Sequence, residues 1–113
     1  MKIVLRDNQV LEGIWFDASE VVVVLGVECR ADAMNYVLWS KRQNACALFR
    51  VDMFDVVDES LSERWVCNFS LKSGSMNFAP AAWNANGFWD KYNDGDREAE
   101  SVFNEERHLL EGE

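Results

Sequence analysis

Hydrophobic residues recur at short spacing through the first seventy or so residues, a pattern typical of strands. Three segments, residues 2–6, 10–17 and 20–30, are rich in Val, Ile, Trp and Phe, and turn-forming Asp, Asn and Ser residues separate them. Short links between consecutive strands favour an antiparallel meander. Residues 21–25 have no polar alternation, which predicts a central strand covered on both faces.

Three further segments, residues 34–41, 46–58 and 64–72, also have the period of strands. In the second, the hydrophobic and polar residues alternate and indicate one buried and one exposed face. The third alternates most strictly. It predicts an inner face made of four side chains, Trp65, Cys67, Phe69 and Leu71.

The character of the chain changes after residue 75, where helical signals begin. Pro80 followed by small residues predicts a short helix over residues 81–85, and residues 93–96 form a turn. Asp96 is then the N-cap of a last helix over residues 97–110, in which Ala99, Phe103 and other apolar residues form one stripe. We therefore predict a single α+β domain over residues 1–113. A mainly antiparallel sheet of about five to seven strands, within residues 2–78, carries the short helix and the longer C-terminal helix.

One acid lies inside the apolar stripe of the last helix. Glu106 follows Ala99 by seven residues and therefore falls about 20° from it around the helix. An unpaired buried carboxylate is costly, so one interpretation is that Glu106 lies at the rim of the helix or accepts a hydrogen bond from a Trp, Tyr or Arg of the sheet. The other is that the stripe is partly open and Glu106 belongs to a binding surface. His108 falls on the opposite side and should face solvent.

Length and composition describe one self-sufficient domain. The chain has 113 residues, of which 49% are hydrophobic, enough for a core. The longest apolar stretch is far shorter than a membrane span needs, and the N-terminus lacks a signal-peptide core, so we expect a cytoplasmic protein with no membrane partner. Cys29, Cys46 and Cys67 have no CxxC spacing, which disfavours disulfides and zinc and predicts buried small hydrophobic residues.

The net charge of −9 lies entirely in the second part of the chain. Residues 1–51 carry six acids and six bases, whereas residues 52–113 carry fourteen acids and five bases, and residues 90–113 alone contribute −6. Such an acidic surface attracts a basic partner and repels phosphates, so direct binding of nucleic acid is disfavoured.

Motifs for catalysis or metal binding are missing from the sequence. It has no nucleophile elbow and no glycine-rich phosphate loop, and its single histidine is predicted to be exposed. Residues 90–96 resemble the start of a calcium loop, but Tyr92 and Ser101 stand where two of the ligands are needed. We therefore expect a protein that is not an enzyme and has no metal or cofactor.

Aromatic residues adjoin the acids of the C-terminal part and suggest anchors for a partner protein. Packing of these rings in the core is the alternative role. The predicted partner-binding residues form two acidic groups with two aromatic residues in the second: Asp52, Asp55, Asp58, Glu59 and Glu63, then Trp89, Asp90, Tyr92, Asp94, Asp96, Glu98 and Glu105.

The C-terminal third carries a resemblance to a known class of proteins. With its Pro80-Ala81-Ala82-Trp83 and GFWDKYNDGD segments, followed by Ala99, Phe103 and Glu106, this small acidic Trp-rich domain resembles the immunity proteins of bacterial polymorphic and contact-dependent growth inhibition toxin systems. These proteins share no universal binding motif, so no residue role is transferred. The resemblance implies a cytoplasmic protein that binds one cognate toxin domain, for which a nuclease would supply the basic surface, and blocks its active site or substrate groove.

Two other functions are compatible with the sequence. One is a small acidic adaptor or structural domain that binds another protein without a toxin. The other is a small enzyme or ligand-binding domain with a pocket lined by Trp and Glu residues, which should show converging polar groups.

Overall fold

The computed structural model describes residues 1–7 and 9–113 and confirms the α+β class. Its strands form two antiparallel sheets, a small one in the order β2-β1-β6 and a large one in the order β5-β4-β3-β8-β7. The elements are β1 (Lys2–Leu5), β2 (Val22–Val23), β3 (Gly26–Cys29), β4 (Met34–Ser40), β5 (Ala45–Arg50), the 3-10 helix η1 (Val51–Met53), β6 (Phe54–Asp58), β7 (Trp65–Ser70), β8 (Ser75–Pro80), the 3-10 helix η2 (Ala81–Asn84), α1 (Phe88–Asn93) and α2 (Arg97–Glu111).

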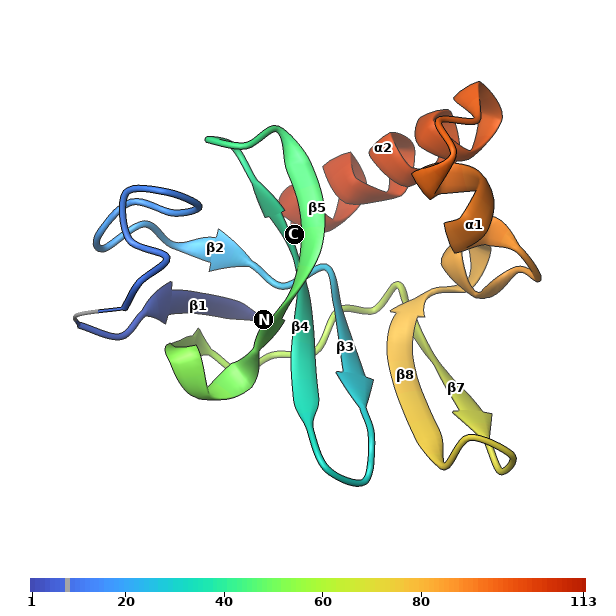
Figure 1. Ribbon diagram of the computed structural model, residues 1–113, viewed down its shortest axis with the longest axis horizontal. Helices are drawn as coiled ribbons and strands as arrows, with labels where there is room; N and C mark the ends of the chain where they lie inside the picture. Colours follow the sequence, from blue (N-terminus) through green and yellow to red (C-terminus); the bar gives the residue numbers. More distant parts are fainter. Residues whose placement is uncertain (8) are drawn as a thin grey trace.

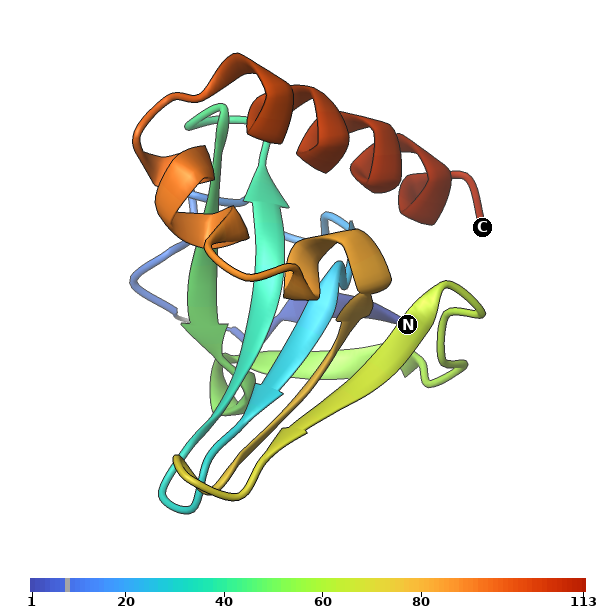
Figure 2. The same ribbon diagram turned by 90° about the vertical axis from the view of Figure 1, so that its right-hand side faces the viewer.

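The large sheet separates two hydrophobic cores. In β4, Tyr36 and Leu38 face the first core, which lies against the small sheet, whereas Val37 and Trp39 pack into the second core beneath the helices. This follows from the alternation of side chains along a strand. The small sheet and the helices thus lie on opposite sides of β4 (Figure 1), and the helices cover only one end of the large sheet (Figure 2).

The predicted central strand over residues 20–30 is wrong in one respect, because the structure divides it between the two sheets. β2 belongs to the small sheet and β3 to the large one. Between them, Val24 is buried in the first core and Leu25 in the second, while Val21 is 56% exposed. The apolar run reflects a chain that crosses between the sheets. Gly26 starts β3 where a Cβ atom would lie 2.8 Å from the carbonyl oxygen of Phe78, so the crossing requires glycine.

Two other strand predictions change. Residues 10–17 form turns with a single bridge between Glu12 and Phe16, and Phe16 is fully buried in the first core. The segment over residues 46–58 is broken at η1, where the chain passes from the large sheet to the small one. Its alternation is nevertheless confirmed on the apolar side, because Phe49, Val51 and Met53 all pack into the first core.

The predicted inner face of residues 64–72 is wrong. β7 pairs with β8 and forms an edge of the large sheet. Phe69 is 56% exposed, Leu71 is 87% exposed and Cys67 is exposed as well, so the prediction of buried cysteines fails there. Only Trp65 is anchored in the fold, and its Nε1 donates to the Leu25 carbonyl oxygen at 2.9 Å. The residues do alternate as predicted, but among the described elements none covers that face of β7 beyond Trp65.

The C-terminal helix is confirmed with its predicted cap. The Asp96 carboxylate accepts a hydrogen bond from the backbone N–H of Ala99 at 3.0 Å, and the stripe buries Ala99, Phe103 and Leu110. Pro80 closes β8 instead of opening an α-helix, because the next residues form η2. The short α-helix begins later, at Phe88. Within the described residues, no helix combines the length and the apolar character needed to cross a membrane.

Glu106 has the partner that the first interpretation required. Its two carboxylate oxygens accept hydrogen bonds from Nε and Nη2 of Arg64, each at 2.7 Å. These hydrogen bonds and the negative charge of Glu106 together raise the pKa of the Arg64 guanidinium. This bidentate pair ties the segment before β7 to α2. His108 is exposed, as predicted.

Candidate functional site

The second acidic group occupies α1, the turn after it and the exposed side of α2. Asp90 lies in α1, Asp94 ends it, Asp96 caps α2, and Glu98 and Glu105 are exposed on α2. In the described part of the chain, none of these five carboxylates forms an ion pair. Their charge is therefore offered to solvent or to a partner.

Some of these acids also stabilise α2 itself. Asp96 supplies the cap, and Glu98 lies in the first helical turn, where the helix dipole favours a negative charge. Asp94, at the C-terminal end of α1, and Glu105, in the middle of α2, have no such role. A partner-binding function is therefore best tested on Asp94 and Glu105, together with Asp90, which lies in the first turn of the short α1 and not in α2.

Three acids of the first group form ion pairs or hydrogen bonds within the protein. Asp52 lies 3.6 Å from Arg50, and Asp55 lies 3.0 Å from Arg6. Asp58 accepts a hydrogen bond from the Ser60 backbone N–H at 2.9 Å, and bonds from Ser60 lower the pKa of this carboxyl group.

The remaining acids of the first group, Glu59 and Glu63, are exposed in the loop between β6 and β7. This loop lies at the C-terminal end of α2, where the Ser62 hydroxyl bonds to the Glu113 carboxylate at 2.9 Å. The second group begins at the other end of α2. Fifteen residues of helix span about 22 Å, so Asp96 and Glu98 lie far from this loop along the helix. Glu105 lies closer to it, because it precedes Glu106, the partner of Arg64.

The predicted aromatic anchors serve both the core and an open pocket. Trp89 and Tyr92 are half-buried, and their ring centroids lie 6.1 and 4.6 Å from that of the fully buried Phe103. Their remaining surface lines a cavity of about 440 Å³ between α1 and the large sheet. The two roles foreseen for these rings therefore coexist.

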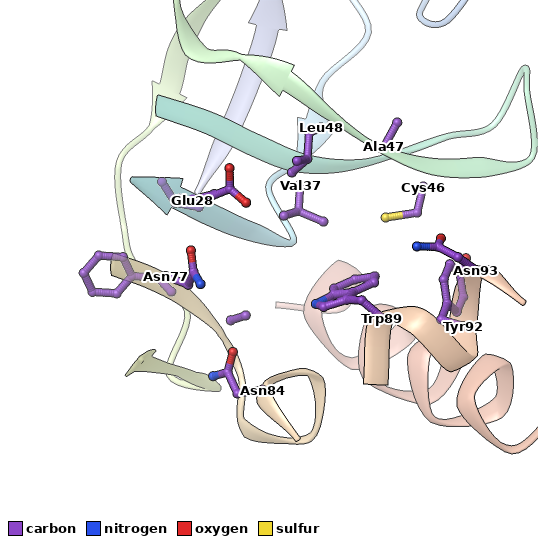
Figure 3. Close-up of a pocket in the computed structure, with 13 residues that line it drawn as sticks. Glu28, Val37, Cys46, Ala47, Leu48, Asn77, Asn84, Trp89, Tyr92 and Asn93 are labelled. Atoms are coloured by element: carbon purple, nitrogen blue, oxygen red, sulfur yellow. The ribbon is translucent and has the colours of Figure 1, made fainter. Parts of the chain in front are cut away.

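Polar groups converge on this pocket from the sheet side. Glu28 of β3 and Asn77 of β8 point toward the space in front of Trp89, and Asn84 of η2 lies below them (Figure 3). Val37 and Cys46 form the apolar part of the wall. Burial raises the pKa of the Cys46 thiol to about 12, so it is not a nucleophile near neutral pH.

Two amide atoms at this pocket lack hydrogen-bond partners. Within the described structure, Asn77 Oδ1 and Asn84 Nδ2 are buried and unpaired. An unmade hydrogen bond of a buried polar group costs about 1–3 kcal/mol. Unpaired groups of this kind at a cavity wall are the ones that a ligand can satisfy.

Sequence reasoning missed Glu28, Asn77 and Asn84. The missing information is strand register: Asn35 pairs with Glu28, Glu28 with Asn77, and Asn77 with Asn68. Directly opposite residues present their side chains on one face, so these four form a polar row across the sheet on the side of the helices. Each has hydrophobic residues directly before and after it in its own strand, and only the pairing brings the four together.

Metal binding has no support from the geometry of the described residues. Among them, no three or more His, Cys, Asp or Glu side chains are grouped so that they could hold an ion.

Comparison with known proteins gives no relative. No family model, no curated protein and no solved structure matches this chain.

Proposed function

We propose that this protein is a non-enzymatic inhibitor of the immunity type, which binds a basic toxin domain in the cytoplasm and neutralises it. The observation that carries the proposal is the uncompensated charge of α1 and α2. Residues 90–113 hold nine acids and three bases, and within the described structure the side chains of Asp90, Asp94 and Glu105 form no ion pair and cap no helix.

Exposed charges of one sign accelerate the encounter with a partner of the opposite sign. A toxin that acts on nucleic acid must itself be basic, and carboxylates on a rigid helix can occupy the sites that phosphates would take. The half-buried Trp89 and Tyr92 adjoin these acids on α1, and aromatic residues next to a charged rim are typical of protein-binding surfaces.

The test begins with capture of the partner from the native cell and its identification. The captured protein should be basic, should be toxic when expressed alone, and should lose its toxicity when this chain is co-expressed. The triple variant Asp90→Asn, Asp94→Asn, Glu105→Gln should bind more slowly, with a weaker dependence of the association rate on salt. An adaptor would bind its partner without rescuing cells from it.

A matched control neutralises three acids that are already paired, Asp17, Asp52 and Asp55, with the same change in net charge. If both triple variants lose the same association rate, general charge explains the effect and the α1–α2 surface is not the binding site. An association rate independent of salt in the unmodified protein would refute electrostatic capture altogether.

A further inference from the structure

The pocket between α1 and the large sheet has the chemistry of a receptor for a cation. Glu28 and Asn77 are directly opposite each other on β3 and β8. The Cβ atoms of such pairs lie about 4.5–5.5 Å apart. One residue offers a carboxylate, and the other offers the unpaired carbonyl oxygen Oδ1. Two neighbouring acceptors of this kind can be satisfied by one group that donates several hydrogen bonds.

The carboxylate of Glu28 is partly withdrawn from water, with 20% of its side chain exposed. Its Oε1 lies 3.1 Å from Nε of Arg30, whose side chain is 62% exposed. In the described structure, Oε2 accepts no hydrogen bond. The guanidinium of Arg30 therefore already contacts Oε1 of Glu28, whereas Oε2 can accept a hydrogen bond from another donor.

The opposite wall carries two aromatic residues, Trp89 and Tyr92, separated from Glu28 by the cavity (Figure 3). Aromatic rings attract cations, and a planar guanidinium combines stacking with hydrogen bonds to a carboxylate. Arginine is thus the side chain whose shape and donors suit this pair of walls.

The negative charge of Glu28 disfavours an anionic ligand in this pocket. A phosphate or carboxylate would meet Glu28 in a protein of net charge −9, and none of the described residues that line the pocket is basic. A neutral polar ligand, such as a sugar, could donate hydroxyl hydrogen bonds to Glu28 but would not neutralise its charge. A cation gains most from it, because the carboxylate is only partly hydrated.

We propose that this pocket binds the guanidinium group of an arginine side chain presented by the basic partner. The inference rests on the proposed function for the source of the arginine. The arginine would place its guanidinium between Glu28 and Asn77 on one side and Trp89 on the other. The acids of α1 and α2 would guide the partner, and the pocket would hold one of its side chains.

The first experiment uses the isolated protein with L-argininamide, and with L-citrullinamide as a neutral probe of the same shape. Amide correlation spectra report the indole N–H of Trp89 and the side-chain amides of Asn77 and Asn84. We expect saturable shifts at these signals with L-argininamide, and binding of L-citrullinamide weaker by about tenfold or more, since hydrogen bonds to charged groups are the stronger ones.

Three variants sharpen this test. Glu28→Gln should weaken L-argininamide binding by about 10- to 100-fold. Glu105→Gln, with the same loss of charge on the exposed side of α2, should leave it unchanged. Arg30→Ala should strengthen it, because the internal guanidinium no longer competes for the carboxylate. Equal binding of the two probes, or an unchanged affinity in Glu28→Gln at an unchanged unfolding midpoint, would overturn the proposal.

The second experiment uses the captured partner. Glu28→Gln should weaken that complex by about tenfold or more, whereas Glu105→Gln should chiefly lower the association rate. If the partner binds Glu28→Gln as tightly as the unmodified protein, the pocket does not receive its arginine, while the proposed function stands. If L-argininamide still requires Glu28 in that case, the site belongs to a free guanidinium compound.

Discussion

Phe103 is the largest buried side chain of α2, and Phe103→Ala tests how much its ring contributes to the packing of this helix. Phe103 has no exposed surface, and its ring centroid lies 4.9 Å from that of Trp83 in a stacked arrangement and 5.9 Å from that of Trp39. It also contacts the rings of Trp89 and Tyr92, which belong to α1. Its side chain therefore joins both helices to the second core.

The cost of Phe103→Ala follows from this environment. Truncating a fully buried Phe to Ala loses the transfer free energy of the ring and leaves a cavity, together about 3–5 kcal/mol. The surrounding rings belong to α1, η2 and the large sheet, so the site cannot collapse easily and the upper part of this range is expected. A domain of this size has a total stability of about 5–15 kcal/mol. The variant should therefore fold but lose a large share of its stability.

Urea unfolding followed by far-ultraviolet circular dichroism measures this loss as a lower midpoint at an unchanged slope. Leu109→Ala, at a site 48% exposed on the same helix, is the control and should change the free energy of unfolding by less than about 0.5 kcal/mol. Phe103→Leu retains most of the volume and should cost about 1–1.5 kcal/mol, which keeps the test informative if the alanine variant does not fold. A loss below about 1 kcal/mol for Phe103→Ala would refute the reasoning.

Three smaller predictions concern the cap, the thiols and acid stability. Asp96→Ala should lower the free energy of unfolding by about 1 kcal/mol in urea, and Asp94→Ala, which removes no cap, by clearly less; equal losses would contradict the capping role. In a thiol-labelling assay near neutral pH, the exposed Cys67 should react in the folded protein, whereas Cys46, whose pKa burial raises to about 12, should react only after unfolding; equal rates would be inconsistent with the fold. The pKa of Asp58 is lowered by hydrogen bonds in the folded state, so its contribution is present above the ordinary aspartate pKa of about 4 and is lost as the pH falls through the lowered folded value. Asp58→Asn should therefore show a smaller fall of the urea midpoint between about pH 5 and pH 2 than the unmodified protein, and an identical fall would exclude this contribution.

Local signals in the sequence predicted those features that depend on neighbouring residues. The cap at Asp96, the stripe of α2 and the exposure of His108 follow from helical geometry within one segment, and all three are confirmed. The sequence also indicated that the Glu106 carboxylate needs a hydrogen-bond partner, because residue spacing alone places it within the apolar stripe of α2. Which residue meets that need was not visible, since Arg64 is 42 positions away.

Errors arose where two arrangements share one local pattern. An apolar run such as residues 21–25 suits a doubly covered strand and equally a chain that crosses between two cores, as it does here. Alternation in β7 indicates a strand with two distinct faces, but it does not say whether another element covers one of them. Coverage is a property of the whole fold.

By itself, the sequence determined the α+β class, the helix boundaries near Asp96 and the unequal distribution of charge, because propensity, periodicity and composition act over short distances. Only the tertiary structure decided which acids remain unpaired and where a pocket opens. Glu28 and Asn77 are 49 residues apart and meet through the register of β3 and β8, and the space beside them exists because the helices cover only part of the large sheet. Such contacts depend on how strands pair and how helices dock, and the sequence of a single segment does not determine either.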